Sequence, residues 1–341
     1  MIRPALLTLT LLISSPLPAY DFKALAAQHI IPSYAELAGR TQQLDRAISA
    51  HCAKPGPQSL DAAQHSFREA FLAWQSAQHL RLGPIQYLSR EHRLQLWPDK
   101  RGTVGRHTRA LLDDPELLAS GFEISSKSVA VQGFSALEQL LFDAQPAHPQ
   151  ACVLMQAISA NLSAIASDLL HDWRDGEQAY ASYLADPGPL NPLFENEAEL
   201  AGQLLNSLHT QLELIQTQKL GRPMGESPDK ARGRRAEAWR SSRSLAAIER
   251  NLMACRSLYR LAFAPELHDA ELAQQIEHAF GAVIFHLNEV DGSLDQAVEQ
   301  PQQWQHLQRL LQTLEGLRTL IGRDMAAQLG LSLGFNSLDG D

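Results

Sequence analysis

The stretch Asp186-Pro187-Gly188-Pro189 divides the sequence into two halves of similar length, and it decides the fold that we expect. Proline cannot continue a helix and glycine commonly follows a helix end, so a helix that reaches this stretch must stop there. Segments with helical periodicity lie on both sides of it, four long ones in each half. The sequence therefore predicts two antiparallel four-helix-bundle domains, 20–187 and 188–341.

The composition favours the same all-α class. Leucine occurs 55 times and valine only 7 times among 341 residues. Unbranched leucine is well tolerated in helices, whereas β-branched residues are the ones enriched in strands. With 45% hydrophobic and 20% charged residues, the chain has the composition of an ordinary globular protein, which excludes a disordered or collagen-like one.

Periodicity and helix breakers place the individual segments. Before the dividing stretch we expect long helices over 24–52, 60–82, 126–142 and 150–184, with a short helix near 103–112. After it we expect helices over 195–219, 230–263, 266–291 and 302–329. The pattern AWxSxxxL occurs at 73–80 and again at 238–245, each time in the expected second long helix of its half. This echo favours an internal duplication.

The first 19 residues have the pattern of a secretory signal peptide. Arg3 is followed by the apolar run 5–13 and by the small-residue stretch 14–19, which predicts cleavage after Ala19. The apolar run is too short to span a bilayer, and we expect no transmembrane span later in the chain. An exported protein with a formal charge of −9 is a poor candidate for nucleic-acid binding.

Three cysteines are present, Cys52, Cys152 and Cys255. In an oxidising compartment they allow one disulfide and one remaining thiol. We favour pairing Cys52 with Cys152, which both lie beside proline-rich turns, with unpaired thiols as the alternative. Cys255 lies in an apolar helical stretch, where a buried free thiol is the commoner state.

Three stretches of the sequence resemble the imelysin-like family of exported bacterial proteins, named after an insulin-cleaving protease. VQGFSALEQLLF at 131–142 is similar to the GxHxxE helix of that family, and LWPDKRGTVGR at 96–106 and LGLSLGFNSLDGD at 329–341 are similar to two further family stretches. The resemblance implies a pair of four-helix bundles in the bacterial envelope and a link to iron acquisition. Peptidase activity is attributed to some members.

In the GxHxxE pattern, Gly133 and Glu138 match the family, and Ser135 stands at the histidine position. Histidine and glutamate three residues apart share a helix face and can reach one cation. A neutral hydroxyl is a much weaker metal ligand, so a site for a divalent metal or iron is weakened here. Glu138 is either a remaining metal ligand or a buried carboxylate paired with an arginine, and we expect it in the interior of the first bundle.

The loop at 97–102 carries an aromatic residue and charges of both signs, which is typical of a binding loop. Asp99 is either a second candidate cation ligand or the cap of a helix that begins near 102–104. Arg101 is a candidate anion clamp or the partner of Glu138. Together with Trp97, and with Asn336 and Asp339 near the C-terminus, these residues complete the binding positions that the resemblance implies.

Six cations form a basic run at the start of an expected helix, where they oppose the helix dipole: Lys230, Arg232, Arg234, Arg235, Arg240 and Arg243. The run is either a solvated face or a set of partners for carboxylates across the bundle interface, Asp339 and Asp341 among them.

Two functions fit these features. The first is a non-catalytic periplasmic protein that binds iron, an iron-bearing ligand or an envelope partner. The second is a metallopeptidase, which needs about three protein ligands and an activated water. That alternative requires a substitute imidazole near Glu138, and the nearest histidines in sequence are His79, His92 and His107. Restoring a histidine at Ser135 should raise divalent-metal affinity if the other ligands of such a site persist.

Overall fold

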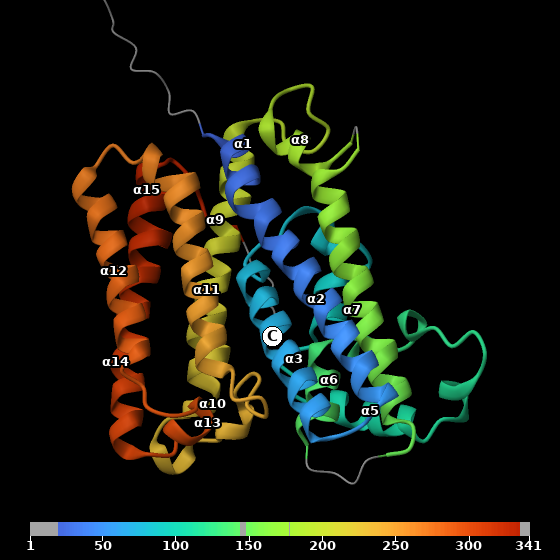
Figure 1. Ribbon diagram of the computed structural model, residues 1–341. Helices are drawn as coiled ribbons and strands as arrows, with labels where there is room; N and C mark the ends of the chain where they lie inside the picture. The colour runs from blue at the N-terminus through green and yellow to red at the C-terminus, as the bar shows by residue number, and fades with distance from the viewer. Residues whose placement is uncertain (1–19, 144–147, 177, 335–341) are drawn as a thin grey trace, which may run out of the picture.

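The structure is a computed structural model that describes residues 20–143, 148–176 and 178–334, and it contains helices but no strands within those ranges. Two groups of roughly parallel and antiparallel helices stand side by side (Figure 1). The all-α prediction is confirmed. The expected signal peptide and the expected site residues Asn336 and Asp339, as well as Asp341, lie outside the described residues.

The first group is built around α2, which packs between α3 and α7. α1 leads into α2 without a break, through a wider π-helical turn at Ala26–Ile30. The helices of this group are α1 (Phe22–Leu25), α2 (Ile31–Ala53), α3 (Pro57–Ala77), α4 (Arg90–Leu94), α5 (Thr103–Leu112), α6 (Phe134–Phe142), α7 (Ala151–Arg174) and α8 (Tyr180–Ala185).

The second group follows the dividing stretch 186–189. Three of its helices run on through π-helical turns, at Ile215–Gly221, Tyr259–Phe263 and Leu320–Met325. Its helices are α9 (Glu197–Leu214), α10 (Arg222–Met224), α11 (Ser244–Leu258), α12 (Ala270–Asn288), α13 (Leu294–Ala297), α14 (Pro301–Thr319) and α15 (Ala326–Gln328).

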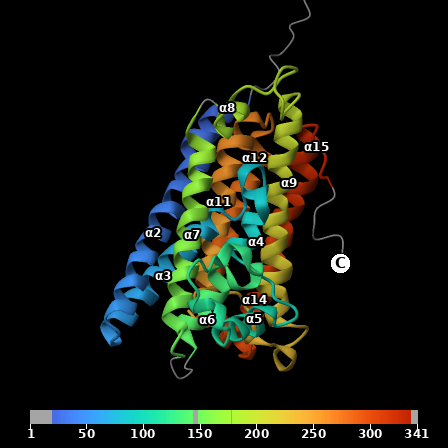
Figure 2. The ribbon, with the colours of Figure 1, turned by 90° about the vertical axis from the view of Figure 1, so that its right-hand side faces the viewer.

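The two groups share one continuous apolar core. The main contact between them joins α3 of the first group to α11 of the second, with α9 beside α11 (Figures 1 and 2). Large side chains such as Trp74, Phe67 and Phe71 are fully buried along α3. Because α3 is covered by α2 on one side and by α11 on the other, it is the central helix of the molecule.

Two expected helices begin later than their sequences indicated. The segment expected over 126–142 forms short 3-10 turns before α6 begins at Phe134. The segment expected from residue 230 forms 3-10 turns as well, and α11 begins only at Ser244. At Gly233 an added Cβ would lie 2.0 Å from the carbonyl oxygen of Asp295, so the chain is held there by tertiary contact. The stretch 230–243 contains five arginines, and those in the first turn of a helix starting at residue 230 would oppose its dipole.

The repeated AWxSxxxL pattern does not occupy equivalent structure. Its first copy lies mostly in α3, with Trp74 fully buried. Its second copy lies in the turns before α11, where Ala238 and Ser242 have positive φ and Trp239 is half-buried. The pattern therefore gives no support to a duplication, although each half does form a bundle.

α7 meets the length and hydropathy expected of a membrane-spanning helix, which our reading of the sequence did not anticipate; no other helix in the described part of the chain does so. Half of its apolar window is buried inside the structure, with Leu154, Ile158 and Leu162 fully covered. This pattern is that of a core helix which packs along α2.

Candidate functional site

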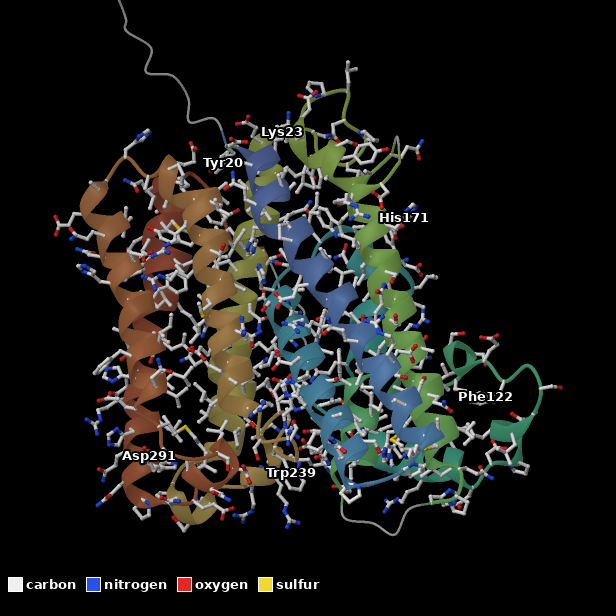
Figure 3. The ribbon with its side chains drawn as sticks, in the orientation of Figure 1. Tyr20, Lys23, Phe122, His171, Trp239 and Asp291 are labelled. Atoms are coloured by element: carbon white, nitrogen blue, oxygen red, sulfur yellow. A yellow bond between two sulfur atoms is a disulfide. The ribbon has the colours of Figure 1, made fainter. Side chains whose placement is uncertain are left out.

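A cavity of about 1130 Å³ opens where the two helix groups meet. The first group contributes its walls from α5, α6, the 95–102 loop and the start of α7, whereas the second group contributes Arg222 and the segment 234–240. Trp239 marks its place at the lower end of the junction between the groups (Figure 3). The cavity collects Trp97, Asp99, Ser135 and Glu138 of the predicted site residues on one surface.

Gly133 sets the position of α6 against α4. It is the N-cap of α6, and an added Cβ would lie 2.2 Å from the carbonyl oxygen of Leu94 and 2.5 Å from that of Arg93. No side chain larger than hydrogen fits at such distances. The glycine of the motif is therefore explained by the approach of the α4 backbone.

Glu138 lies in the interior, as we predicted, but its partner is not an arginine of the 97–102 loop. Its Oε1 accepts hydrogen bonds from the backbone N–H of Ser241 at 2.9 Å and from the Ser241 hydroxyl at 2.7 Å. Burial raises the pKa of Glu138, whereas the two Ser241 donors and the nearby Arg240 lower it. The motif carboxylate thus joins the first helix group to the turn that precedes α11.

Ser135 also has a structural contact, because its hydroxyl donates to the carbonyl oxygen of Leu96 at 3.0 Å. This bond ties α6 to the 95–102 loop. Across the described residues, no group of three or more His, Cys, Asp or Glu side chains is arranged to hold a metal ion. Because Oε1 of Glu138 accepts from Ser241 and Ser135 donates to Leu96, the described residues at the motif offer no set of ligands that fits a resident metal centre.

Asp99 caps α5. Its two carboxylate oxygens accept from the backbone N–H groups of Thr103 at 2.8 Å and Val104 at 2.9 Å, which matches the capping alternative of the two that the sequence left open. Gly102 provides the positive φ of 62° at the N-cap of this helix. Trp97 lines the cavity, whereas Arg101 is exposed and is not among the lining residues.

A buried polar cluster lies at the junction between the groups, centred on Lys219. The Lys219 ammonium group is 1% exposed and donates to Gln75 Oε1 at 2.6 Å, Gln78 Oε1 at 2.8 Å and Asn251 Oδ1 at 2.6 Å. It also forms an ion pair with Glu237 at 2.8 Å. Burial lowers the pKa of Lys219, and attraction to Glu237 opposes that shift.

This cluster reaches the cavity through Gln95, which lines it. Gln95 donates to Glu237 Oε1 at 2.8 Å and accepts from the indole N–H of Trp74 at 2.7 Å. The Lys219 ammonium group lies 5.8 Å from the ring centre of Trp97, another lining residue. The cavity floor is therefore held by hydrogen bonds that join both halves of the chain.

The basic run is partly engaged across the interface. Arg240 donates from Nε to Asp143 Oδ1 at 2.6 Å, so one arginine of the run does pair with a carboxylate of the first group. The guanidinium groups of Arg240 and Arg234 lie 4.5 and 5.3 Å from the ring centre of Trp239. Lys230 instead pairs with its neighbour Glu226 on the surface.

None of the three histidines considered for a metal site accompanies Glu138. His79 is buried, with its Nε2 at 2.8 Å from Nε2 of His29, and burial lowers the pKa of both groups, that of His29 to about 4. His92 and His107 are exposed. The histidines that line the cavity are His51 and His148.

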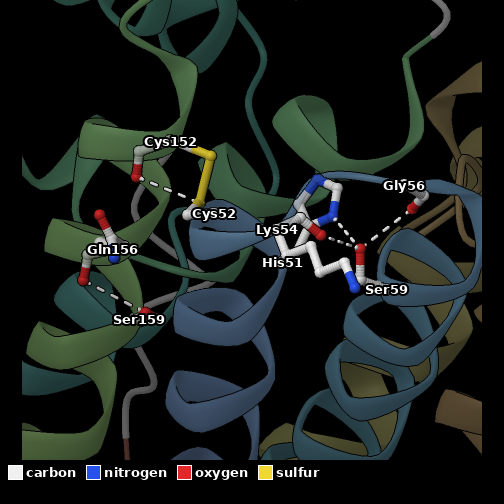
Figure 4. Close-up of a disulfide and its surroundings, with 8 residues drawn as sticks. All are labelled: His51, Cys52, Lys54, Gly56, Ser59, Cys152, Gln156 and Ser159. Carbon is white, nitrogen blue, oxygen red and sulfur yellow. Dashed lines mark hydrogen bonds between the residues drawn. A yellow bond between two sulfur atoms is a disulfide. The ribbon is translucent and has the colours of Figure 1, made fainter.

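Cys52 and Cys152 form a disulfide that joins the end of α2 to the start of α7, and Cys255 is a buried free thiol. The disulfide lies beside the cavity, since Cys152 is a lining residue and the preceding His51 bonds the Ser59 hydroxyl at 3.0 Å (Figure 4). It therefore fixes one rim of the cavity.

The sequence pointed to the motif helix and the 97–102 loop but missed their partners. Ser241, Glu237 and Lys219 lie 80 to 150 residues away in sequence, and only the basic run and Trp239 in the repeated pattern drew attention to that region. A buried lysine has no signature in a single sequence, because its burial depends on glutamine and asparagine side chains from other helices.

Comparison with known proteins gives consistent matches. A family model described as Imelysin, of the peptidase M75 group, matches residues 30–321. Iron-regulated protein A of Synechococcus elongatus is 22% identical over 237 residues; the match covers 68% of this chain and spans 62% of that relative's length.

Two solved structures share the fold. An imelysin-like protein from Psychrobacter arcticum 273-4 has a TM-score of 0.75 and 22% identity, with 92% of this chain and 96% of that chain covered. A protein from Parabacteroides distasonis ATCC 8503, described as an iron-regulated protein A precursor, has a TM-score of 0.71 and 14% identity, with 92% and 97% covered.

Proposed function

Because this chain belongs to the imelysin family, as its match over residues 30–321 establishes, we propose that it is an exported, non-catalytic binding protein of bacterial iron acquisition. The observation that carries the proposal is the cavity between the two helix groups, which brings the motif helix α6 and the 95–102 loop together with the basic segment 234–240. Ligand sites in proteins are concave, have volumes of several hundred Å³ and lie preferentially between domains or helices.

The link to iron rests on the relatives. One is named iron-regulated protein A and a second is described as a precursor of such a protein. The word precursor also supports export, as do the signal-like first 19 residues and the disulfide, which is typical of oxidising compartments. We place the protein in the periplasm of its bacterium.

The non-catalytic part of the proposal is supported by the contacts of the motif residues. A zinc peptidase site needs three protein ligands that leave a position open for water. Here Ser135 donates to a backbone carbonyl and Glu138 accepts two hydrogen bonds from Ser241. Both side chains therefore hold the fold together, and the metallopeptidase alternative receives no support from them.

The test is iron uptake in the bacterium that encodes the chain. We expect deletion of the gene to lower ⁵⁵Fe accumulation from iron-poor medium and the intact gene to restore it. Unchanged accumulation in the deletion strain would contradict the proposal. The purified protein should leave the insulin B chain uncut with or without added zinc, and cleavage would instead support a peptidase.

A second variant examines the motif itself. Ser135→His restores the family histidine, yet Glu138 accepts two hydrogen bonds from Ser241 and so is held away from a ligand's role. We expect equilibrium dialysis to give the same zinc and iron binding for this variant and the parent. Tighter binding by the variant would show that Glu138 can leave Ser241 to become a ligand.

A further inference from the structure

The wall that the second helix group gives to the cavity is entirely basic or apolar. Its lining residues are Arg222, Arg234, Arg235, Ala236, Ala238, Trp239 and Arg240, without one acidic side chain among those described. This is unusual in a chain whose formal charge is −9. Arg234 and Arg235 are exposed to solvent, whereas Arg222 and Arg240 are partly buried. Like charges gathered on one wall repel each other and attract anions to it.

The acidic residues of the opposite wall do not compensate the charges of Arg222 and Arg235. Asp99 caps α5 with both oxygens, and Glu138 accepts from Ser241. Asp143 is paired with Arg240. Asp113 lies 3.3 Å from the ring nitrogen of His148.

Arg222 and Arg235 have neither a hydrogen bond nor an ion pair from their guanidinium groups to any residue within 20–143, 148–176 and 178–334. Burial lowers the pKa of Arg222, repulsion from Arg235 lowers it further, and attraction to Asp99 opposes both. The two guanidinium groups therefore lie near each other at the cavity and repel, with their donors unused by the described part of the protein.

We propose that this basic wall binds the carboxylate groups of a small anionic iron chelate, with Arg222 and Arg235 as its principal anchors. That the ligand contains iron rests on the proposed function, whereas its negative charge is inferred from the arginines of the wall. Guanidinium groups form paired, charge-assisted hydrogen bonds with carboxylates, and a bound anion relieves the repulsion between the two arginines. A bare ferric ion would be repelled by the same wall.

The size and the aromatic walls of the cavity fit a small chelate. Its volume of about 1130 Å³ is slightly above the usual range of about 300–1,000 Å³ for small-molecule sites, so a small chelate fits inside with room to spare. Trp97 and Trp239 give flat apolar surfaces on opposite halves of the chain. Trp239 is held by contact with Arg234 and Arg240, so these two arginines position the indole while Arg222 and Arg235 remain available for the ligand.

The experiment uses protein purified from cells that express the full chain, with ferric citrate labelled by both ⁵⁵Fe and ¹⁴C. Equilibrium dialysis should show the two labels bound together in a constant ratio. Arg222→Gln and Arg235→Gln should each weaken binding about tenfold, the loss expected for one charged hydrogen-bonding group. Neither variant should be less stable to heat than the parent, because neither guanidinium group has a partner in the described residues and each change removes a repulsion.

Arg232→Gln is the matched control. It lies in the same basic run, is exposed and does not line the cavity. Among the described residues, its guanidinium group donates only to the backbone oxygens of Asp229 and Ala231. Its affinity should equal that of the parent. Equal affinity in Arg222→Gln, Arg235→Gln and the control would overturn the assignment of the anchors.

Two further ligands test which kind of anion the wall binds and whether it binds an anion at all. Binding of oligogalacturonate in preference to ferric citrate would overturn the small-chelate assignment in favour of an acidic polymer. Equal or tighter binding of ferrichrome, a ferric complex without net charge, would overturn the anion assignment while leaving a role in iron acquisition intact. Unchanged ⁵⁵Fe accumulation in the deletion strain would overturn the proposed function itself, whatever the purified protein binds.

Discussion

The hydrogen bonds between Glu138 and Ser241 are the contact through which the motif helix stabilises the whole molecule, and removing them should have a large and specific effect. Glu138 comes from α6, whereas Ser241 comes from the turn before α11, 103 residues later. We consider three variants, Glu138→Ala, Ser241→Ala and the double variant that carries both changes.

The expected loss in the free energy of unfolding follows from the two hydrogen bonds. The carboxylate accepts two hydrogen bonds at 2.9 and 2.7 Å, and bonds to a charged group contribute about 1.5–3 kcal/mol each. Burial of the charged carboxylate is itself costly, as the raised pKa of Glu138 indicates. Removing the carboxylate regains that cost, which offsets part of the sum. We expect Glu138→Ala to lower the free energy of unfolding by about 3 kcal/mol, and Ser241→Ala by about 1.5 kcal/mol, because the backbone N–H of residue 241 still donates.

The assay is urea unfolding of the four proteins at pH 7, followed by circular dichroism. The double variant should be less destabilised than the sum of the single ones, with an interaction energy of about 1.5 kcal/mol for the hydroxyl bond. An interaction energy near zero would refute the contact. A loss of less than 1 kcal/mol in Glu138→Ala would show that the carboxylate is free for another role.

Three further predictions concern the buried polar groups and the disulfide. Lys219→Met should lower the free energy of unfolding by about 3–5 kcal/mol, because Glu237 is then buried without its cation. Adding Glu237→Leu should recover part of that loss in urea unfolding. A loss below 1 kcal/mol in Lys219→Met would contradict the ion pair. Replacing Cys52 and Cys152 by serine opens a loop of 100 residues and should cost about 4 kcal/mol in the same assay, whereas the parent and the variant should be equally stable in reductant. The His29–His79 pair resists protonation in the folded state, because burial lowers the pKa of His29 from 6.5 to about 4. The contribution of His29 to the free energy of unfolding should therefore be fully present above pH 6.5. It should fall by about 3 kcal/mol as the pH decreases from 6.5 to 4, because the unfolded chain then binds the proton that the folded chain does not. His29→Gln with His79→Gln should flatten that dependence, and an unchanged slope would contradict it.

The fold could be predicted from the sequence because it depends on periodicity and helix breakers, which are local. Thr103–Leu112 was expected as a short helix and forms α5. The errors arose where tertiary contacts determine the backbone. Gly133 delays the start of α6 because it packs against α4, and Gly233 is held by Asp295, so neither helix begins where its periodicity does.

The site was predictable only in part, for a related reason. Gly133, Ser135, Glu138, Trp97 and Asp99 could be named from short patterns, and the structure gathers them on or beside one cavity. Their partners Ser241 and Leu96 could not be named, since a hydroxyl or a backbone carbonyl carries no signal of what it will bind. Arg222 and Arg235 have no partner among the described residues because of where the nearby carboxylates point, which only the folded chain determines.

Anomalous diffraction at the iron absorption edge, from crystals grown with ferric citrate, tests directly whether the basic wall of the cavity binds a ferric chelate. We predict one iron peak inside the cavity, on the side of Arg222 and Arg235, with the carboxylate groups of the chelate at hydrogen-bonding distance from both guanidinium groups. Glu138 should still accept from Ser241, and Asp99 should still cap α5. An iron coordinated directly by Glu138 or Asp99, or bound outside the cavity, would contradict this prediction.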